Sequence, residues 1–345
     1  MKNTAVIGAG MAGITAARTL LKAGHRVTVF EKSHGAGGRM STRNTPYGSF
    51  DHGAQYFTVR DPQFLKALTE VPGTQAVCRA WSANAVRVLD PLGRVIEAAL
   101  PTREPHFVAS PGMNALVRHW AQPLEAASSV HYQTQVQFLK RQGQAWDLVC
   151  ADGSKHAGFD HVVLAIPHVQ ADFLLRQSGA PAAGFKGLKA LSEVQVAPCW
   201  TLMLAYPLVN QSGLSHLGPQ WNAARSVHHR IAWLCRESSK PGRASVERWT
   251  VQASAEWSLE HLNDDAERVQ LKLQRAFAEL TGIHSAPSHA QAHLWRYAKT
   301  THPLGQPYQW DSATGLGTCG DWHLGHRVED AFVSGLELGL HLCGK

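Results

Sequence analysis

The chain lacks the features that mark membrane proteins, disulfide-stapled proteins and nucleic-acid-binding proteins. No stretch of its 345 residues approaches about 18 uninterrupted apolar residues, so we expect no transmembrane helix. Its six cysteines are scattered and include no C-x-x-C pair, which favours a cytoplasmic protein with reduced thiols. There is no run of five or more Lys or Arg, so nucleic-acid binding has no motif behind it.

Internal repeats and low-complexity linkers are also missing. The N-terminal apolar stretch is strand-like and broken by glycines, so we expect no signal peptide. A length of 345 residues with 44% hydrophobic content suits two domains, and the missing linker predicts that they pack tightly and share a cleft. The net charge of +7 would attract an anionic small molecule, although a basic solvated surface explains most of these charges.

The first residues of the chain carry the strongest pattern. A short apolar strand, Thr4–Ile7, is followed by G-x-G-x-x-G at Gly8, Gly10 and Gly13. Helical spacing over Ile14–Ala23 and a second strand, His25–Phe30, follow the glycines. Glu31 then stands 18 positions after the last glycine. This order predicts a βαβ unit whose helix N-terminus binds a pyrophosphate and whose acidic residue binds a ribose hydroxyl.

A second glycine pair indicates which dinucleotide is bound. Gly37 and Gly38 follow Glu31 closely, and Arg39 comes directly after them. Glycines allow backbone amides to approach a phosphate, and a guanidinium adds charge-assisted hydrogen bonds to it. A domain that binds only a nicotinamide dinucleotide has no need of this second clamp. A surface turn with a solvated arginine is the alternative interpretation.

These motifs resemble those of the flavin amine oxidase superfamily. The resemblance rests on G-A-G-M-A-G, F-E-K and G-A-G-G-R-M in the first forty residues. The further runs Asp51–Thr58, Pro111–Met113 and Cys319–Trp322 are similar to the renalase-like branch of that superfamily. The resemblance extends from residue 4 to about residue 340 and is thin between about 170 and 300.

The resemblance implies a non-covalent FAD cofactor. It assigns Asp321 to the ribityl chain, Val136 to the adenine, and Gln55, Tyr56 and Phe57 to the flavin ring, although Phe57 could equally be core. The helix expected at Glu329–Cys343 would point its N-terminus at the flavin and stabilise its reduced, negative form. The residues expected to bind FAD are Gly8, Gly10, Met11, Ala12, Gly13, Glu31, Lys32, Gly38, Arg39, Gln55, Tyr56, Phe57, Val136, Gly320, Asp321 and Glu329.

The resemblance also implies a reaction. An FAD-dependent oxidase would transfer hydride from a small substrate to flavin N5 and pass the electrons to O2, which gives H2O2. Oxidation of dihydro-NAD(P) isomers is the expectation, and an amine oxidase, a desaturase or a non-catalytic flavin-fold binding protein are the alternatives. No catalytic residue is assigned, and Tyr56 and Gln252 are the candidate pocket residues. Gln252 stands where renalase-like chains usually carry a His.

The predicted architecture is α/β, and α+β overall. It combines a Rossmann-like FAD-binding domain with a second domain of mixed β-sheet and helices, as in amine oxidases and p-hydroxybenzoate hydroxylase. We assign 1–60, 105–170 and 299–345 to the FAD-binding domain and 61–104 and 171–298 to the substrate domain. Further strands are expected at Trp81–Leu89, Arg94–Leu100, Val130–Leu139, Trp146–Cys150, His161–Pro167, Trp200–Tyr206, Arg230–Cys235, Arg248–Ala253 and Gly315–Gly320. Further helices are expected at Pro62–Thr69, after Pro111-Gly112 with an end near Pro123, and at Asp264–Thr281.

The sequence gives little support for a metal site. His323 and His326 could lie on one face of the chain, but no adjacent Cys or carboxylate completes a set of four ligands. We therefore expect no metal, and we expect a small-molecule substrate and O2 as the partners, without nucleic acid or membrane.

Overall fold

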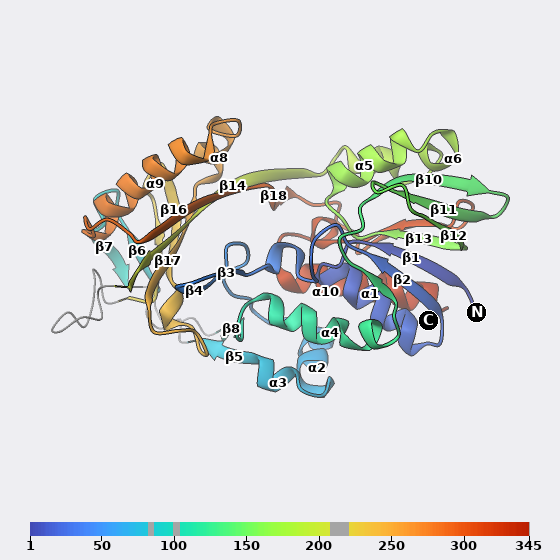
Figure 1. The fold of residues 1–345 in the computed structure, drawn as a ribbon, viewed down its shortest axis with the longest axis horizontal. Helices are drawn as coiled ribbons and strands as arrows, with labels where there is room; N and C mark the ends of the chain where they lie inside the picture. The colour runs from blue at the N-terminus through green and yellow to red at the C-terminus, as the bar shows by residue number, and fades with distance from the viewer. Residues whose placement is uncertain (82–85, 99–103, 208–220, 345) are drawn as a thin grey trace.

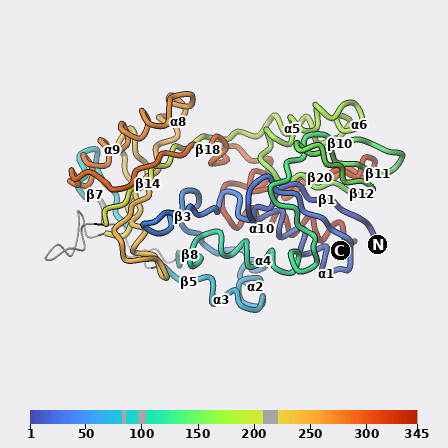
Figure 2. The backbone as a smooth tube through the Cα atoms, in the orientation of Figure 1, coloured from blue at the N-terminus to red at the C-terminus, as the bar shows by residue number. Residues whose placement is uncertain are grey.

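The protein has two lobes that are joined by long strands. The computed structural model describes residues 1–81, 86–98, 104–207 and 221–344. One lobe contains a six-stranded sheet and both chain termini, and the other contains a seven-stranded sheet (Figure 1). Strands β14 and β18 extend from the seven-stranded sheet toward the first lobe, as the backbone trace also shows (Figure 2).

The six-stranded sheet is mostly parallel and contains the βαβ unit that the N-terminal pattern predicts. Its strands lie in the order β19-β20-β13-β1-β2-β9, and all neighbours except β19 and β20 are parallel. Their bounds are β1 Asn3–Ile7, β2 Arg26–Phe30, β9 Val130–His131, β13 His161–Leu164, β19 Gln309–Asp311 and β20 Leu316–Thr318. The run Gly315–Gly320 is thus a strand of the first sheet, as expected, and Asp321 follows its carboxyl end.

Three helices cover this sheet. They are α1 Met11–Lys22, α4 Asn114–Ala126 and α10 Val328–Leu342. Gly335 allows α10 to approach α1 closely, since a Cβ there would overlap the Ala12 carbonyl. The α4 helix does not end near Pro123, which corrects the prediction, because it continues for another three residues and buries Leu124. Proline removes one hydrogen bond of the helix without ending it here.

A small antiparallel sheet adjoins the first lobe. It consists of β10 Val136–Gln142, β11 Ala145–Cys150 and β12 Lys155–Phe159. The expected turn at Asp152-Gly153 is present, with Gly153 at φ +83°. The expectation of one strand over Val130–Leu139 is wrong, because the chain turns at Gln133 (φ +54°) and enters a different sheet. The helices α5 His168–Gln177, α6 Ala180–Ala183 and α7 Leu188–Leu191 follow.

The seven-stranded sheet forms the second lobe, in the order β18-β14-β17-β16-β15-β6-β7. Its strands are β6 Val86–Leu89, β7 Val95–Ala98, β14 Gln195–Tyr206, β15 Ala223–Ser226, β16 Ile231–Arg236, β17 Glu247–Ala253 and β18 His289–His302. The helices α8 Ala255–Glu260 and α9 Ala266–Thr281 lie on it (Figure 1). The sequence predicts α9 well: Asp265 caps it by accepting from the Glu267 and Arg268 amides, and Gly282 ends it at φ +73°.

Residues 61–109 differ most from the expected elements. They form α2 Pro62–Glu70, α3 Thr74–Val77, β5 Cys78–Trp81 and β8 His106–Ala109, besides β6 and β7. The expected strand Trp81–Leu89 is two strands in two sheets, because Trp81 pairs with His106 while Val86 pairs with Ala223. Residues 82–85 and the expected end of the Arg94–Leu100 strand lie outside the described residues. The domain boundaries stay a prediction.

Two short strands connect the lobes. They are β3 Arg43–Thr45 and β4 Gly48–Phe50, and they pair antiparallel with Arg43 opposite Phe50. The 3-10 turns are η1 Gly38–Met40, η4 Glu237–Ser239 and η5 Asp321–His323. Among the helices of the described residues, none is both long and apolar enough to cross a membrane.

Candidate active site

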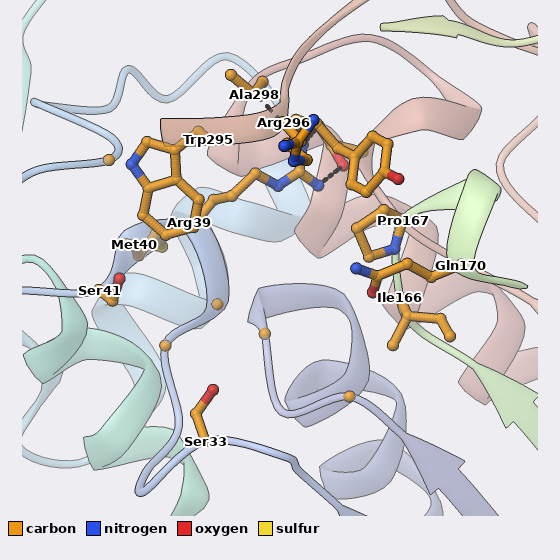
Figure 3. Close-up of a pocket in the computed structure, with 18 of the residues that line it drawn as sticks. Ser33, Arg39, Met40, Ser41, Ile166, Pro167, Gln170, Trp295, Arg296 and Ala298 are labelled. Carbon is orange, nitrogen blue, oxygen red and sulfur yellow. Dashed lines mark hydrogen bonds and ion pairs between the residues drawn. The ribbon is translucent and has the colours of Figure 1, made fainter. Parts of the chain in front are cut away.

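A cavity of about 1980 Å³ lies between the two lobes. Its wall includes the carboxyl ends of β1 and β2 in the first lobe and residues of β14, β16, β17 and β18 in the second. In Figure 3, Trp295, Arg296 and Ala298 of β18 lie together with Arg39, and Ile166, Pro167 and Gln170 lie on another side. Pockets for one small molecule usually measure about 300–1,000 Å³. The cavity therefore has room for a large cofactor and a substrate together.

The glycine loop at the start of α1 has the geometry of a phosphate cradle. A Cβ at Gly13 would overlap the Gly8 carbonyl oxygen and touch Ala165, so this glycine permits close packing of helix and strand. A Cβ at Gly10 would meet only the Gly38 Cα, at 3.9 Å, so the backbone on this side of the loop is open. Gly10 and Gly38, one from each glycine cluster of the sequence, thus lie next to each other in the cavity wall at the N-terminus of α1.

Glu31 is fixed by backbone amides. It follows β2, is 8% exposed and lines the cavity. Its Oε2 accepts from the Ala9 amide and its Oε1 from the Ser33 amide, each at 2.8 Å. The carboxylate therefore holds the glycine loop and the segment after β2 together, which sequence reasoning did not anticipate. Carboxylate oxygens accept more than one hydrogen bond, so each can also receive a ribose hydroxyl.

Arg39 and Asp321 form a two-pronged ion pair. Arg39 Nη1 donates to Asp321 Oδ2 at 2.9 Å, and Arg39 Nη2 donates to Asp321 Oδ1. Arg39 Nη1 also lies 3.4 Å from the carbonyl oxygen of Ala298 on β18 (Figure 3). The sequence predicts both residues for the same cofactor, and the structure brings them into direct contact although 282 positions separate them.

The N-terminus of α10 reaches the cavity through Arg327, Val328 and Ala331. Glu329 itself is 6% exposed and turns away, because its carboxylate accepts from the backbone amides of Arg60 and Asp61. The helix can thus direct its dipole into the cavity, while the Glu329 side chain fixes the chain that leads into α2.

Most of the residues expected to bind FAD line the cavity. Those that do are Gly8, Gly10, Met11, Ala12, Glu31, Lys32, Gly38, Arg39, Val136, Gly320 and Asp321, together with the candidate pocket residue Gln252. The described cavity wall does not include Gly13, Gln55, Tyr56, Phe57 or Glu329. The place of Gln55, Tyr56 and Phe57 along the flavin ring therefore stays a prediction.

Aromatic packing and hydrogen bonds explain where these three side chains lie. Phe57 is 3% exposed and packs on Phe64 and Phe107, so it is core. Tyr56 packs on His106, with ring centroids 4.2 Å apart. Gln55 turns back on its own loop and donates to the carbonyl oxygens of Asp51 and Gly53.

A buried network of charges anchors that loop. Asp51, Lys240 and Arg243 have fully buried side chains, and Lys240 Nζ lies 3.0 Å and Arg243 Nη2 2.6 Å from Asp51 Oδ2. Glu237 accepts from Lys240 at 3.1 Å. Burial acts to raise the pKa of the Asp51 carboxyl, but the charges of Lys240 and Arg243 outweigh it and hold this pKa below its usual value. The network joins the loop to η4 of the second lobe.

The loop ends in a wall of the cavity. Ala54 N donates to the Arg39 carbonyl oxygen at 2.9 Å, and a Cβ at Gly53 would overlap that same oxygen. Gln252 Nε2, from β17, donates to the Gly53 carbonyl oxygen at 2.8 Å. Gln252 therefore lies in the cavity wall, in contact with the loop that carries His52.

A cluster of His52, His293 and Trp295 faces the same cavity, and sequence reasoning missed it. The ring centroids lie 4.8–5.1 Å apart, and Trp295 Nε1 donates to the His52 carbonyl oxygen at 2.8 Å. Burial, His293 and Arg43 lower the pKa of His52 to about 3, and burial and Arg43 lower that of His293 to about 4. Both rings are neutral at neutral pH. The alternation of His293, Trp295 and Tyr297 along β18 is the signal that could have revealed this wall.

The charge of the cavity wall is strongly positive. Among the described residues, seven basic side chains line it, namely Lys32, Arg39, Arg43, Arg118, Arg296, Lys299 and Arg327. Three acidic side chains, Glu31, Glu256 and Asp321, oppose them. Such a surplus favours anionic ligands and disfavours cationic ones.

His323 lies in the protein interior. It is fully buried, stacks on Trp322 and contacts Thr318 Oγ1 at 3.0 Å and the Gln306 carbonyl oxygen at 3.1 Å. Burial lowers its pKa to about 3. Within the described residues, no group of three or more His, Cys, Asp or Glu is placed to hold a metal ion.

Comparison with protein families accounts for this geometry. Residues 6–71 match the NAD(P)-binding Rossmann-like domain, and residues 96–337 match the flavin containing amine oxidoreductase family, which covers more than half of the chain. The chain belongs to this flavin-containing amine oxidoreductase family. It is therefore an oxidoreductase of a flavin-dependent class, and the open glycine cradle and Glu31 suit such a cofactor.

Curated relatives match over short segments. The chain is 44% identical over 69 residues to a 4,4'-diapophytoene desaturase of Staphylococcus haemolyticus, which is 20% of this chain and 13% of that protein. It is 54% identical over 48 residues to an L-amino-acid oxidase of Vipera ammodytes ammodytes, which is 14% of this chain and 10% of that protein.

Solved structures match over the whole fold. A proposed protoporphyrinogen oxidase from Exiguobacterium sp. 255-15 has a TM-score of 0.76 at 12% identity, with 99% of this chain and 98% of that chain covered. A putrescine oxidase solved with putrescine has a TM-score of 0.66 at 11% identity, with 100% and 99% covered. At such low identity the likeness shows a common fold and leaves the substrate open.

Proposed function

We propose that the protein is an oxidase that holds FAD without a covalent bond and oxidises an anionic dihydro-nicotinamide dinucleotide. The observation that carries the proposal is the positive charge of the cavity wall, where seven basic side chains stand against three acidic ones. The pyrophosphate of FAD neutralises only part of this surplus. A second dinucleotide, or another substrate with phosphate groups, would neutralise more of it.

Different residues of the first lobe would bind different parts of the cofactor. Glu31 would accept from a ribose hydroxyl while the Ala9 and Ser33 amides hold it in place. The open backbone at Gly10 and the N-terminus of α1 would receive the pyrophosphate. Arg39, which is already paired with Asp321, would add positive charge beside it. The N-terminus of α10 would stabilise negative charge that develops at the pyrimidine edge of the flavin.

The proposed reaction requires little catalysis by protein side chains. A bound flavin supplies a hydride acceptor whose electrons pass to O2 with release of H2O2. Dihydro-nicotinamide, O2 and one proton are thereby converted to the oxidised nicotinamide and H2O2. Loss of hydride makes the nicotinamide ring aromatic, so no general base is required. The neutral rings of His52 and His293 and the indole of Trp295 can pack against a planar substrate without repelling its positive charge after oxidation.

The proposal is tested with the purified protein in air. Acid precipitation should release all yellow colour into the supernatant as FAD, and colour retained in the pellet would contradict non-covalent binding. Turnover of 2- or 6-dihydro isomers of NAD or NADP should consume one O2 and form one H2O2 for each donor oxidised. Oxidation of these donors without H2O2 would contradict the assignment as an oxidase.

An amine oxidase or a desaturase is the second candidate. The aromatic side chains of Trp233, Trp295 and Tyr297 on the cavity wall favour it, because aromatic faces attract cationic or apolar substrates. L-amino-acid oxidases, a desaturase and a putrescine oxidase among the similar proteins fit the same reading. The surplus of positive charge opposes a protonated amine, which is why we place this candidate second.

A further inference from the structure

Arg43 is half-buried and has no partner among the residues that the structure describes. It begins β3, lies opposite Phe50 of β4 and lines the cavity. Within the described part of the chain, its guanidinium forms no hydrogen bond or ion pair. A partly desolvated guanidinium with five donors and no acceptor is in an unfavourable state that an oxyanion relieves.

The surroundings of Arg43 offer neutral hydrogen-bonding groups. His52 is 5% exposed, and its Nδ1 is buried and has no hydrogen-bond partner among the described residues. The His52 and His293 ring centroids are 4.9 Å apart, and both rings line the cavity. Arg43 lines the same cavity, and its positive charge helps to lower the pKa of both rings.

The acidic residues of the cavity wall are engaged elsewhere or exposed. Glu31 accepts from two backbone amides, and Asp321 is paired with Arg39. Glu256 is exposed in the first turn of α8. None of these acidic side chains is paired with Arg43, so its guanidinium is open to an oxyanion that enters the cavity.

We propose that Arg43, His52 and His293 form an oxyanion subsite that binds a phosphate or carboxylate group of the substrate. The Arg43 guanidinium supplies the positive charge. The neutral imidazoles of His52 and His293 supply hydrogen-bond donors without adding further positive charge. Only the identity of the ligand depends on the proposed function, because we take the hydride donor to be the molecule that binds at this subsite. It makes Arg43 a residue that selects anionic substrates.

The test compares three variants of the flavin-loaded protein. Calorimetric titrations with inorganic phosphate, pyrophosphate and acetate measure oxyanion binding without turnover, and the two acid classes distinguish phosphate from carboxylate. Arg43→Gln should weaken the preferred probe by about tenfold or more, and Arg43→Lys should recover part of that loss. Arg296→Gln removes another cavity-lining cation, and it should weaken the probe by less than about threefold through the general field alone.

Anaerobic flavin reduction gives the second readout. In Arg43→Gln, the donor concentration for half-maximal reduction should rise by about tenfold, while the limiting rate changes little. Unchanged oxyanion binding in Arg43→Gln, an equal loss in Arg296→Gln, or no oxyanion binding in the wild type would each overturn the subsite. If oxyanions bind at Arg43 but no dihydro isomer reduces the flavin, the proposed function fails while the subsite stands.

Discussion

Single residues set the geometry of the cofactor site before any ligand binds. The carboxylate of Glu31 is tied to the Ala9 and Ser33 amides, and Arg39 is tied to Asp321. On the substrate side, Gln252 is tied to the Gly53 carbonyl oxygen. Each of these side chains therefore stabilises the cavity wall and also faces the cavity. Experiments with variants must distinguish the structural role from a role in ligand binding.

Glu31→Ala should weaken FAD binding by about 1.5–3 kcal/mol, because a charged acceptor for ribose is lost. Titration of the apoprotein with FAD, followed by quenching of flavin fluorescence, measures this change. Asp160→Ala is the matched control, since Asp160 likewise accepts from a backbone amide, that of Asn3 at 2.7 Å, but lies outside the cavity wall. If Glu31→Ala holds FAD as tightly as Asp160→Ala does, the ribose site is misplaced.

Gln252→His should change the rate of flavin reduction by the dihydro isomers and leave the affinity for FAD within about twofold. The reason is that Gln252 lines the cavity on β17 and contacts Gly53 rather than the glycine cradle. Stopped-flow reduction and FAD titration give the two readouts. Gln291→His, on β18 outside the cavity wall, is the control. Equal rates in both variants would remove Gln252 from the substrate pocket.

At the scale of elements, the sequence predicts the βαβ unit, β20, α9 and α10 because each carries a local signal. Glycines, caps and apolar periodicity mark these elements directly. The sequence does not predict strand β18, which carries His293 and Trp295, and it predicts one strand over Val130–Leu139 where the structure has two strands in different sheets. These errors share a cause: the partner strands of β9, β10 and β18 lie far away in sequence, and only tertiary pairing fixes which sheet each joins.

The positions of the site residues, like the elements, could be predicted only where a local sequence pattern fixes them. Gly8, Gly10 and Glu31 could be predicted because their spacing defines their role in the loop. Phe57 could not be placed, because an aromatic residue next to a cofactor motif packs equally well in a core, and here it does. The unpaired state of Arg43 depends on which carboxylates lie near it in space, and no sequence pattern shows that.

The two glycines of the cradle should respond differently to alanine. Gly13→Ala forces a methyl group against the Gly8 carbonyl and Ala165, and overpacking of this kind costs about 1–3 kcal/mol of folding stability. Gly10→Ala should leave the melting temperature of the apoprotein almost unchanged and weaken FAD binding, since its Cβ enters only the open side of the loop. Thermal melts and FAD titrations of both variants would contradict this account if the two effects were reversed or equal.

At the scale of the whole molecule, buried polar groups make the fold sensitive to acid. Asp51, Glu237, Lys240 and Arg243 join the loop of the first lobe to η4 of the second, and they are fully or almost fully buried. His323 is a buried neutral group beneath the same cavity wall at Asp321 and Trp322. The pKa of Asp51 is held below its usual value and that of His323 is lowered, so at both groups the unfolded chain binds protons more readily than the folded chain and acid lowers folding stability.

The pH dependence of unfolding tests this for His323. Its pKa is lowered from 6.5 to about 3, so between these values the unfolded chain binds a proton that the folded chain does not. Folding stability should therefore fall as pH decreases below 6.5, by up to about 1.4 kcal/mol per pH unit from this residue. Urea unfolding from pH 7 to pH 5 should show a shallower loss in His323→Gln. Parallel curves for the two proteins would show that His323 is protonated or exposed in the native state.

The central claim is that one positively charged cavity holds a flavin and an anionic hydride donor. Anaerobic mixing of the flavin-loaded protein with 2- and 6-dihydro isomers of NAD and NADP, with NADH and NADPH, and with a panel of amines tests it directly. The account predicts that a dihydro isomer bleaches the flavin much faster than any amine, because its phosphates meet Arg43 and the other cavity cations. It should also bleach the flavin faster than NADH, because the renalase-like motifs favour the 2- and 6-dihydro isomers. A faster rate with an amine than with every dihydro isomer would contradict the account and favour an amine oxidase.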